Sequence, residues 1–339
     1  MDKIALVIGA TGQIGQAAVP ALARDGWEVR AASRHPDGVW PAELGVREVR
    51  LDRGDDAQLA AAVGDGVDVV VDAVGYNAGH AEQLLKLAGR IGSAVVISSA
   101  AVYADTAGRG LGGDFPVPIT EAQSTMAPDD GDYATRKVAL ERALLDAGDA
   151  LPTTVLRPAA IHGPRSEFLR EWYFVRRALD GRRHRILAHN GENRFQPTAT
   201  ANLAELIRLA AAKPGSRALN AADPDAPTVR EIGAAIHAVL GYEAEEVLID
   251  GPPPMGAVGE TPWSIAHPFV LDMSAARREL GYAPVTGYTE SLPATVDWLV
   301  SQARERQGGD AFPRLNELHG VDFFDYATED DWLAQRSNR

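Results

Sequence analysis

The chain has 339 residues, of which 45% are hydrophobic and 24% charged, and this balance argues against disordered, collagen-like and fibrous proteins. Its 33 basic and 47 acidic residues give a net charge of −14, which would repel nucleic acid and an anionic membrane surface. The absence of cysteine excludes disulfides, thiolate metal sites and cysteine nucleophiles, and the length predicts about two domains.

The first half of the chain alternates short hydrophobic runs with helical patterns. The runs are nearly continuous, as in parallel strands buried on both faces, and cover residues 4–8, 28–32, 47–51, 67–71, 94–98 and 153–156. Between them lie Ala- and Leu-rich stretches long enough for crossover helices, at residues 14–24, 57–63, 80–90 and 133–146. This alternation predicts an α/β fold with a Rossmann-type doubly wound parallel sheet.

After residue 158 the pattern changes. Proline, glycine and arginine become frequent, the strand-like runs become short, and helical patterns cover residues 168–179 and 203–212. The expected division is a sheet domain over residues 1–160, with returning segments near 195–215 and 262–276, and a smaller C-terminal lobe over 161–339 that ends in an aromatic, acidic tail.

A glycine-rich loop joins the first predicted strand to the first predicted helix. Gly9, Gly12 and Gly15 recur at three-residue spacing, and glycine lets the backbone turn tightly and approach a ligand. The N-terminus of the helix presents free N–H groups and positive potential to an anion such as a pyrophosphate. A glycine-rich turn without a ligand is the alternative, but the position within a βαβ unit favours a dinucleotide site, with contacts from Gly9, Thr11, Gly12, Gln13, Ile14 and Gly15.

The end of the second predicted strand indicates which dinucleotide binds. An NAD-dependent enzyme usually has a carboxylate there for the adenosine ribose, whereas this chain has Ser33 and Arg34. Because arginine makes bidentate bonds to phosphate, we expect NADP(H) to be preferred, with NAD(H) as the alternative; Arg34 is otherwise a solvated loop residue. Asp52, at the end of the third strand, would accept a hydrogen bond from the adenine amine or cap the next helix.

Tyr133 and Lys137 lie four residues apart and share one face of the fourth predicted helix. A free tyrosine titrates near pH 10, roughly, so we expect the Lys137 cation to stabilise the phenolate of Tyr133, which exchanges a proton with the substrate. Ser99, at the end of the fifth strand, would hold the substrate oxygen. Such a pair alone is most often a surface pair, but its order after the glycine loop and the Ser-rich strand end favours catalysis.

Together these segments resemble the extended short-chain dehydrogenases/reductases, the group often called the NAD-dependent epimerase/dehydratase family. The similar segments span most of the chain: residues 8–15, 98–103, 133–141, 156–164, 228–232 and 271–282. The resemblance implies that Ser99, Tyr133 and Lys137 are catalytic, that Lys137 also binds the nicotinamide ribose, and that the stretch after the sixth strand lines the nicotinamide. The further cofactor contacts that we expect are Ala73, Val74, Pro158 and Ile161.

Departures from the family pattern narrow the reaction. Members that dehydrate sugars carry Asp-Glu directly after the catalytic hydroxyl, where this chain has Ala100 and Ala101, so dehydration is disfavoured. His162 replaces a common tyrosine, and residues 72–77 differ from the usual epimerase pattern, which weakens an assignment as a sugar epimerase.

An arginine-rich stretch in the second half indicates where an anionic substrate would bind. Residues 165–194 contain eight arginines and four acidic residues. In the family this region meets the substrate, whereas the alternative is that the arginines form the solvated face of a helix. No histidine spacing indicates a metal site. The expected substrate contacts are Ser99, Ala100, Arg176, Arg177 and Arg194.

The leading prediction is an NADP-dependent reductase or dehydrogenase that acts on a carbonyl or secondary alcohol of a small polar substrate, anionic or nucleotide-linked. The alternatives are a nucleotide-sugar epimerase with tightly held NAD and a non-catalytic dinucleotide sensor or scaffold. The resemblance implies a homodimer through the helices at 80–90 and 133–146. We expect no nucleic-acid or membrane partner. Because no apolar run reaches the roughly 18 residues of a membrane span and no signal-peptide pattern precedes the first strand, we expect a cytoplasmic protein.

Overall fold

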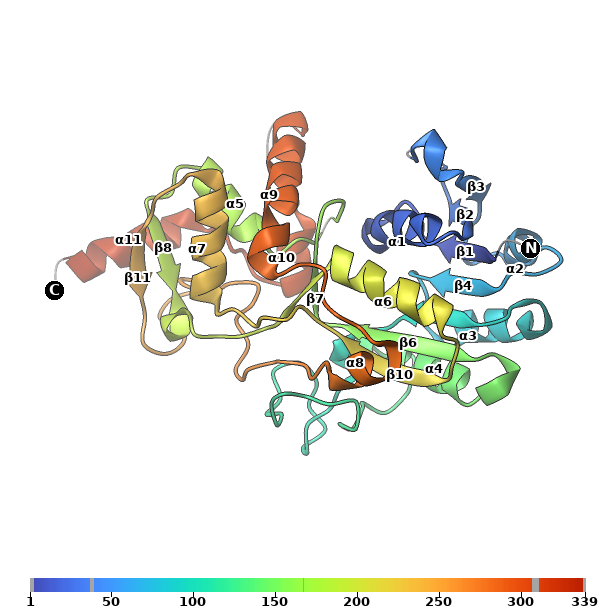
Figure 1. The fold of residues 1–339 in the computed structure, drawn as a ribbon. Helices are drawn as coiled ribbons and strands as arrows, with labels where there is room; N and C mark the ends of the chain where they lie inside the picture. The colour runs from blue at the N-terminus through green and yellow to red at the C-terminus, as the bar shows by residue number, and fades with distance from the viewer. Residues whose placement is uncertain (1–2, 37–39, 167, 307–310, 338–339) are drawn as a thin grey trace.

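The computed structural model describes residues 3–36, 40–166, 168–306 and 311–337. Figure 1 shows a sheet domain at the right, built mostly from the N-terminal half, and a smaller lobe at the left. The C-terminal helix lies on the side of the lobe that faces away from the sheet domain. None of the helices in these ranges combines the length and the apolarity needed to cross a bilayer.

Seven parallel strands form the central sheet in the order β10-β6-β5-β4-β1-β2-β3. Their bounds are β1 Ile4–Ile8, β2 Glu28–Ser33, β3 Arg47–Arg50, β4 Val69–Asp72, β5 Ala94–Ile97, β6 Thr153–Pro158 and β10 Arg217–Ala221. Every residue of β4 and β5 is buried, as expected for strands covered by helices on both faces. The predicted α/β fold with a doubly wound parallel sheet is confirmed. The sequence pattern does not predict β10, because arginine and asparagine interrupt its apolar residues.

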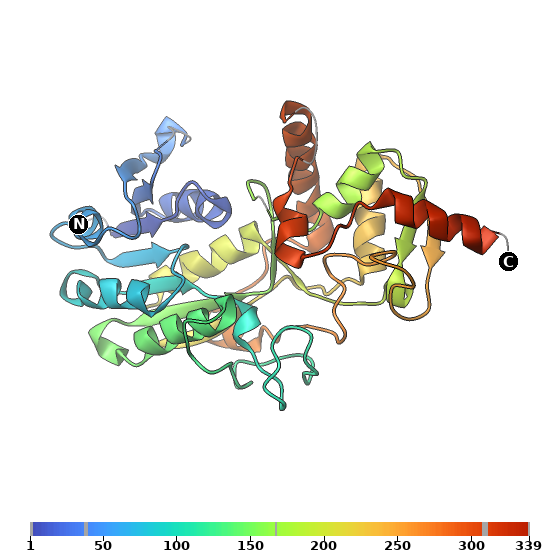
Figure 2. The same cartoon turned by 180° about the vertical axis from the view of Figure 1, so that it is seen from behind.

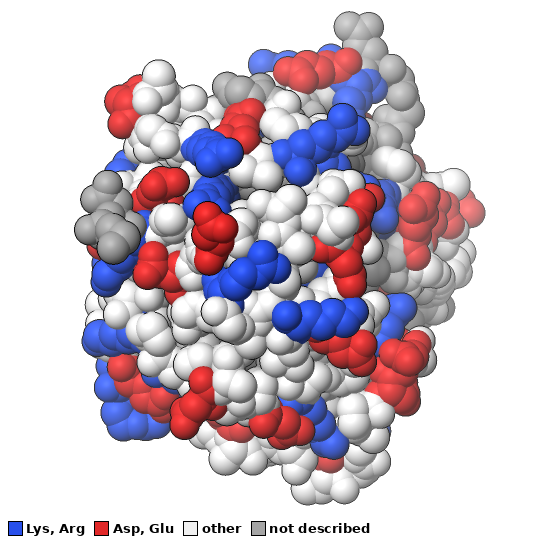
Figure 3. Space-filling view, turned by 90° about the vertical axis from the view of Figure 1, so that its right-hand side faces the viewer, with Lys and Arg blue, Asp and Glu red and all other residues white. Residues whose placement is uncertain are grey.

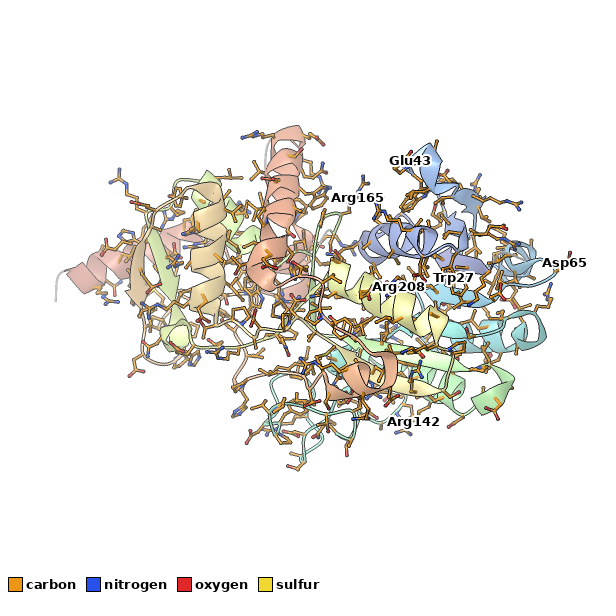
Figure 4. The ribbon with its side chains drawn as sticks, in the orientation of Figure 1. Trp27, Glu43, Asp65, Arg142, Arg165 and Arg208 are labelled. Carbon is orange, nitrogen blue, oxygen red and sulfur yellow. The ribbon has the colours of Figure 1, made fainter. Side chains whose placement is uncertain are left out.

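Two helices cover one face of the sheet. They are α1 (Gln13–Arg24) and α6 (Thr200–Ala212), which pack against each other. The Arg208 guanidinium of α6 donates to Asp25 Oδ1, just beyond α1, at 2.7 Å, close to Trp27 (Figure 4). The segment 195–215 therefore places a helix on the sheet domain.

The opposite face is covered by α2 (Asp56–Val63), α3 (Ala78–Leu85) and α4 (Tyr133–Leu145). Figure 2 shows α3 and α4 side by side. The helix predicted over residues 80–90 is shorter than expected at its C-terminal end, and it begins at Ala78 because the Asn77 side chain accepts a hydrogen bond from the His80 amide at 3.1 Å. Short 3₁₀ helices complete the connections: η1 Ala42–Leu44, η2 Ala88–Arg90, η3 Ala100–Val102, η4 Gly148–Ala150 and η5 Ala188–Gly191.

The lobe contains two small parallel sheets. One pairs β7 (Ala160–His162) with β9 (Pro197–Ala199), and the other pairs β8 (His184–Leu187) with β11 (Glu245–Leu248). The later part of the chain adds α5 Trp172–Leu179, α7 Val229–Leu240, α8 Ser274–Leu280, α9 Tyr288–Glu305, α10 Arg314–His319 and α11 Tyr326–Ser337. Isolated bridges join Leu271 to Ile119 and Phe269 to Phe195, so residues 262–276 also run beside earlier parts of the chain. We propose the division into residues 1–160 and 161–339, with these returning segments, as the domain organisation.

The C-terminal tail docks on α5. Phe312 packs edge-on against Trp172 with ring centroids 4.9 Å apart, and Phe323 lies at 5.8 Å from Tyr173 in the same geometry. Glu329 of α11 is buried against Arg177 of α5, with which it forms an ion pair. The tail is thus part of the core of the lobe.

The surface that faces away from the lobe carries acidic and basic side chains intermixed (Figure 3). This face therefore offers no extended surface of a single charge.

Candidate active site

The carboxyl ends of the parallel strands meet at one edge of the sheet. The pairing aligns Ile8 of β1 with Ala32 of β2 and with Asp72 of β4, and Ile97 of β5 with Leu156 of β6. In open α/β sheets, ligands bind outside this edge where the strand order reverses, here between β1 and β4. The segments that follow the strands share this edge, namely the glycine loop, Ser33–Arg34, Ala73–Val74, Ser98–Ser99 and the end of β6 at Pro158.

The glycine loop packs so closely that side chains at Gly9 and Gly15 would collide with neighbouring atoms. Gly9 has a φ of +82°, and a Cβ there would lie 2.8 Å from Cγ1 of Val74. A Cβ on Gly15 would overlap the Gly9 carbonyl oxygen, so only glycine lets α1 start this close to the loop. A Cβ on Gly12 would meet only that same oxygen, at 3.3 Å, which leaves this side of the loop open.

The N-terminus of α1 is free of competing groups. Gly12 is its N-cap, no side chain of the described residues caps the helix, and its first turn contains no acidic residue. The amides there are therefore available to an anion, and the loop fits a dinucleotide pyrophosphate. Among the other predicted contacts, Thr11 and Ile14 are half-buried, while Gln13 donates from Nε2 to the Gly163 carbonyl at 3.0 Å and links the loop to the chain after β7.

The end of β2 presents an arginine to solvent. Ser33 is buried, whereas Arg34 is exposed and makes no hydrogen bond or ion pair with any part of the chain that the structure describes. Asp52 Oδ1 accepts from the Gly54 amide at 3.0 Å. The alternative role of Asp52 as a helix cap is wrong, because Asp55 caps α2 by accepting from two amides of its first turn.

Tyr133 is the first residue of α4, and a capping box fixes this helix end. Asp132 accepts from the Thr135 amide at 2.9 Å, and Thr135 Oγ1 accepts from the Asp132 amide at 3.1 Å. The side chain of Tyr133 is 45% exposed, whereas Lys137, one turn later, is buried. The predicted pair therefore presents a tyrosine toward solvent with a buried cation behind it.

Lys137 joins two strand ends beneath the tyrosine. Its Nζ donates to the carbonyl oxygen of Ile97, the last residue of β5, at 2.8 Å and to that of Gly75, beyond β4, at 2.6 Å. An ammonium has three donors, so one remains for a ligand such as a ribose hydroxyl. Burial lowers the pKa of Lys137 to about 8, and the charges of Asp72 and Glu141 oppose this, so the lysine keeps its proton at neutral pH.

The pKa of Tyr133 lies above its ordinary value. Burial raises this pKa, whereas a hydrogen bond with Ser99 lowers it. Lys137 donates to two carbonyls and its Nζ lies 5.6 Å from the Tyr133 ring centroid, and its stabilisation of the Tyr133 phenolate stays a prediction. The phenol of Tyr133 is therefore protonated at neutral pH and can act as an acid.

The strand end after β5 supplies two serines. Ser99 Oγ accepts from the Ala101 amide at 3.2 Å and thereby caps η3. Ser98 Oγ is buried and has no hydrogen-bond partner in the described ranges. Ala100 is buried in the core of the sheet domain, so its side chain is not available for the expected substrate contact.

A buried polar chain holds α4 against the sheet behind the site. Arg157 of β6 donates to Glu141 of α4 at 2.6 Å, and its guanidinium lies 5.0 Å from the ring centroid of Tyr103. Tyr103 in turn donates to Asn220 Oδ1 of β10 at 2.6 Å, and burial raises the pKa of Tyr103 to about 12. These contacts fix the helix of Tyr133 and Lys137 relative to the strand end that carries Ser99.

The stretch after β6 is held in place by a buried hydrogen bond between His162 and Asp223. Pro158 is buried and Ile161 is half-buried, as parts of β6 and β7. His162 Nε2 lies 2.9 Å from Asp223 Oδ2, while the other carboxylate oxygen of Asp223 accepts from Asn202 Nδ2 at 2.8 Å. His162, which stands where the family often has tyrosine, therefore serves to attach β7 to the chain after β10.

Tyr76 also lies at this site, although no motif in the sequence points to it. Its ring centroid lies 4.9 Å from Lys137 Nζ, and its side chain is 49% exposed. The unusual sequence of residues 72–77 was the one feature that could have drawn attention to it.

Two of the three selected arginines are engaged by the C-terminal tail. Arg177 is buried and pairs with Glu329, and the Arg176 guanidinium lies 4.0 Å from the ring centroid of Phe324. Arg194 is half-buried and donates to the Ala226 carbonyl. Only Arg194 is therefore retained as a substrate contact in our proposal.

No group of three or more potential metal ligands occurs among the residues that the structure describes.

The sequence model of the NAD dependent epimerase/dehydratase family matches residues 5–222. The chain is 29% identical to 2-alkyl-3-oxoalkanoate reductase of Stenotrophomonas maltophilia (strain K279a), over 85% of this chain and 96% of the reductase. This match covers more of the chain than the family model does, so it includes part of the lobe.

Two epimerases are among the solved structures that share the fold. UDP-N-acetylglucosamine 4-epimerase from Methanobrevibacter ruminantium M1 superposes with a TM-score of 0.68 at 21% identity, over 89% of this chain and 99% of that one. UDP-glucuronic acid 4-epimerase from Bacillus cereus, whose structure holds a fluorinated UDP-sugar and NAD, superposes with a TM-score of 0.65 at 17% identity, over 88% and 99%.

Proposed function

Because the chain belongs to the NAD dependent epimerase/dehydratase family and is an NAD(P)-dependent enzyme, we propose that it is a reductase that prefers NADP(H) and acts on the carbonyl group of a small polar substrate. The observation that carries this proposal is the convergence of Ser99, Tyr133 and Lys137 on the sheet edge that also holds the glycine loop. A non-catalytic sensor would need a dinucleotide loop but not this acid and its buried cation.

Each of the three residues has a distinct role in the reduction. A bound nicotinamide dinucleotide would supply the hydride, with its two electrons, to the carbonyl carbon. Tyr133 donates its proton to the carbonyl oxygen, so the product is an alcohol, and Tyr133 regains a proton from solvent. Ser99 holds the reacting oxygen, while Lys137 uses its remaining donor for the ribose and offsets the charge left on Tyr133.

The cofactor preference rests on Arg34. It follows β2 where a carboxylate would accept from the ribose of NAD, and its guanidinium is exposed and unpaired within the described ranges. A guanidinium there would bind the 2′-phosphate of NADP(H) through charge-assisted hydrogen bonds.

The substrate class rests on the relative in Stenotrophomonas. Its name describes reduction of a 3-oxo acid, in which one carbon separates the ketone carbonyl from the carboxylate. We take 3-oxo acids as the first class to test, with Arg194 as the contact for a further anionic group of the substrate. Ala100 and Ala101 offer no acid and base for eliminating water.

A nucleotide-sugar epimerase is the second candidate. Its supporting observation is that the solved proteins of this fold include epimerases, one of which holds a UDP-sugar and NAD. The same three residues would serve, but the dinucleotide would be NAD and would stay bound between turnovers.

The test begins with freshly purified protein. Any dinucleotide that it releases is identified by mass, NADPH and NADH are titrated by fluorescence, and oxidation of the preferred one is then followed with a set of 3-oxo acids. An empty protein that binds NADPH more tightly and reduces such a substrate supports the proposal. NAD that survives purification favours the epimerase, and binding of neither dinucleotide overturns both.

The proposal includes a homodimer through α3 and α4, which lie side by side on one face of the sheet domain (Figure 2). The mass in solution, measured by light scattering, tests this assembly.

A further inference from the structure

Tyr76 is the second tyrosine at the buried ammonium. Its ring centroid lies 4.9 Å from Lys137 Nζ, and that of Tyr133 lies 5.6 Å from the same atom. The two residues come from different elements, because Tyr76 follows β4 whereas Tyr133 begins α4. Lys137 is 2% exposed, so the phenol rings are part of what separates it from solvent.

The backbone around Tyr76 is held on both sides. The carbonyl of Gly75 accepts from Lys137 Nζ at 2.6 Å, and the Tyr76 amide donates to His80 Nδ1 at 3.0 Å. His80 belongs to α3, whose N-cap is Asn77. The side chain of Tyr76 therefore projects from a fixed turn rather than from a long loop.

The ring of Tyr76 covers Lys137, but its hydroxyl is not engaged by the described residues. The side chain is 49% exposed, and its hydroxyl has no hydrogen-bond partner in the part of the chain that the structure describes. A phenol both donates and accepts hydrogen bonds, so this hydroxyl is available to a ligand.

We propose that Tyr76 binds the substrate at a second oxygen, next to the carbonyl that Tyr133 and Ser99 hold, and that it selects substrates with two oxygen functions close together. This inference rests on the proposed function. For a 3-oxo acid, Tyr76 donates to the carboxylate while Tyr133 donates its proton to the ketone oxygen. A residue that only shields Lys137 from water would need the ring of Tyr76 but not its hydroxyl.

The variant Tyr76→Phe separates these two roles because it keeps the ring and removes the hydroxyl. The probes are 3-oxohexanoate and heptan-4-one, which share the ketone and differ in the carboxylate. We expect Tyr76→Phe to raise KM for 3-oxohexanoate about tenfold, the loss expected for a hydrogen bond to a charged group, with kcat changed little. Its kinetics with heptan-4-one and its affinity for NADPH should equal those of the wild type.

The matched control is Tyr242→Phe, since Tyr242 donates to the Arg182 carbonyl at 2.9 Å in the lobe, away from Lys137. Equal KM values for wild type and Tyr76→Phe with 3-oxohexanoate overturn the inference and leave the proposed function standing. An equal loss with both ketones also overturns it, because the hydroxyl then does not distinguish the carboxylate. A wild type that reduces neither 3-oxohexanoate nor heptan-4-one overturns the proposed function, and the inference with it.

Discussion

Lys137 on the sheet edge and Arg177 on α5 are both buried cations, but they are satisfied in different ways. Lys137 donates to two neutral carbonyl oxygens and keeps one donor, whereas Arg177 is paired with the carboxylate of Glu329. A cation held by carbonyls keeps its net charge for a ligand, while one paired with a carboxylate is largely neutralised. Burial of a cation therefore indicates a site only when its partners leave it charged.

The two regions also differ in what their chain segments provide. The sheet edge collects backbone ends from five strands and the open N-terminus of α1. The arginines of α5 instead face aromatic and acidic side chains of the tail, including Phe324 and Glu329. The high density of arginine in this stretch of sequence therefore indicated where the C-terminal tail packs, and not where a substrate binds.

The largest effect is expected at the sheet edge, for Tyr133→Phe. Loss of the acid should lower kcat roughly a thousandfold, within the range for general acid catalysis, while NADPH affinity stays unchanged. Steady-state kinetics and fluorescence titration measure the two quantities. Tyr326→Phe, whose hydroxyl donates to Asp180 in the lobe, is the control. Retained turnover in Tyr133→Phe would contradict its role as the acid.

The variant Arg177→Met, in the lobe, should lower stability without affecting catalysis. Removing this partner leaves Glu329 buried with only Arg182, so we expect the free energy of unfolding to fall by about 3 kcal/mol. The KM and the NADPH affinity should not change. Urea denaturation and kinetics measure these effects, with the exposed Arg47→Met as control. A rise in KM without loss of stability would return Arg177 to the substrate site.

The features that could be predicted from the sequence are those that depend on residues close together in the chain. The glycine loop, the helix that begins at Tyr133 and the buried strands each follow from a few adjacent residues. The strand β10 could not be found this way, because its polar sequence is recognised only through its pairing with β6, whose Thr154 aligns with Arg217.

The remaining errors involve partners that are far apart in sequence. Arg177 meets Glu329, which is 152 residues later, and no local pattern announces this ion pair. Tyr76 reaches the site because Lys137 joins the chain after β4 to the end of β5. In both cases the missing information was which side chain neutralises or covers a cation.

Arg34 is a third kind of cation, exposed to solvent at the proposed cofactor site. Its guanidinium is exposed and unpaired among the described residues, so its charge remains available for a 2′-phosphate. We expect Arg34→Ala to weaken NADPH binding about tenfold to a hundredfold and to leave NADH binding unchanged. Fluorescence titration of both dinucleotides measures this difference, with Arg47→Ala as control. An equal loss for NADPH and NADH would contradict a phosphate-specific contact.

The smallest effect concerns the charge of Lys137 itself. Its pKa is lowered to about 8, so the ammonium is present below this pH and is lost as the pH rises above it. If this charge supports catalysis, log(kcat/KM) should fall with a slope of −1 above pH 8, which is about tenfold at pH 9. Tyr133 would give a limb at higher pH, because burial raises its pKa above the ordinary value. In Lys137→Met, kcat/KM should be lower than in the wild type at neutral pH, and its decrease near pH 8 should be absent. If the decrease near pH 8 persists in this variant, another group titrates there. The charge that Lys137 keeps by binding carbonyls rather than a carboxylate would then have no role in catalysis.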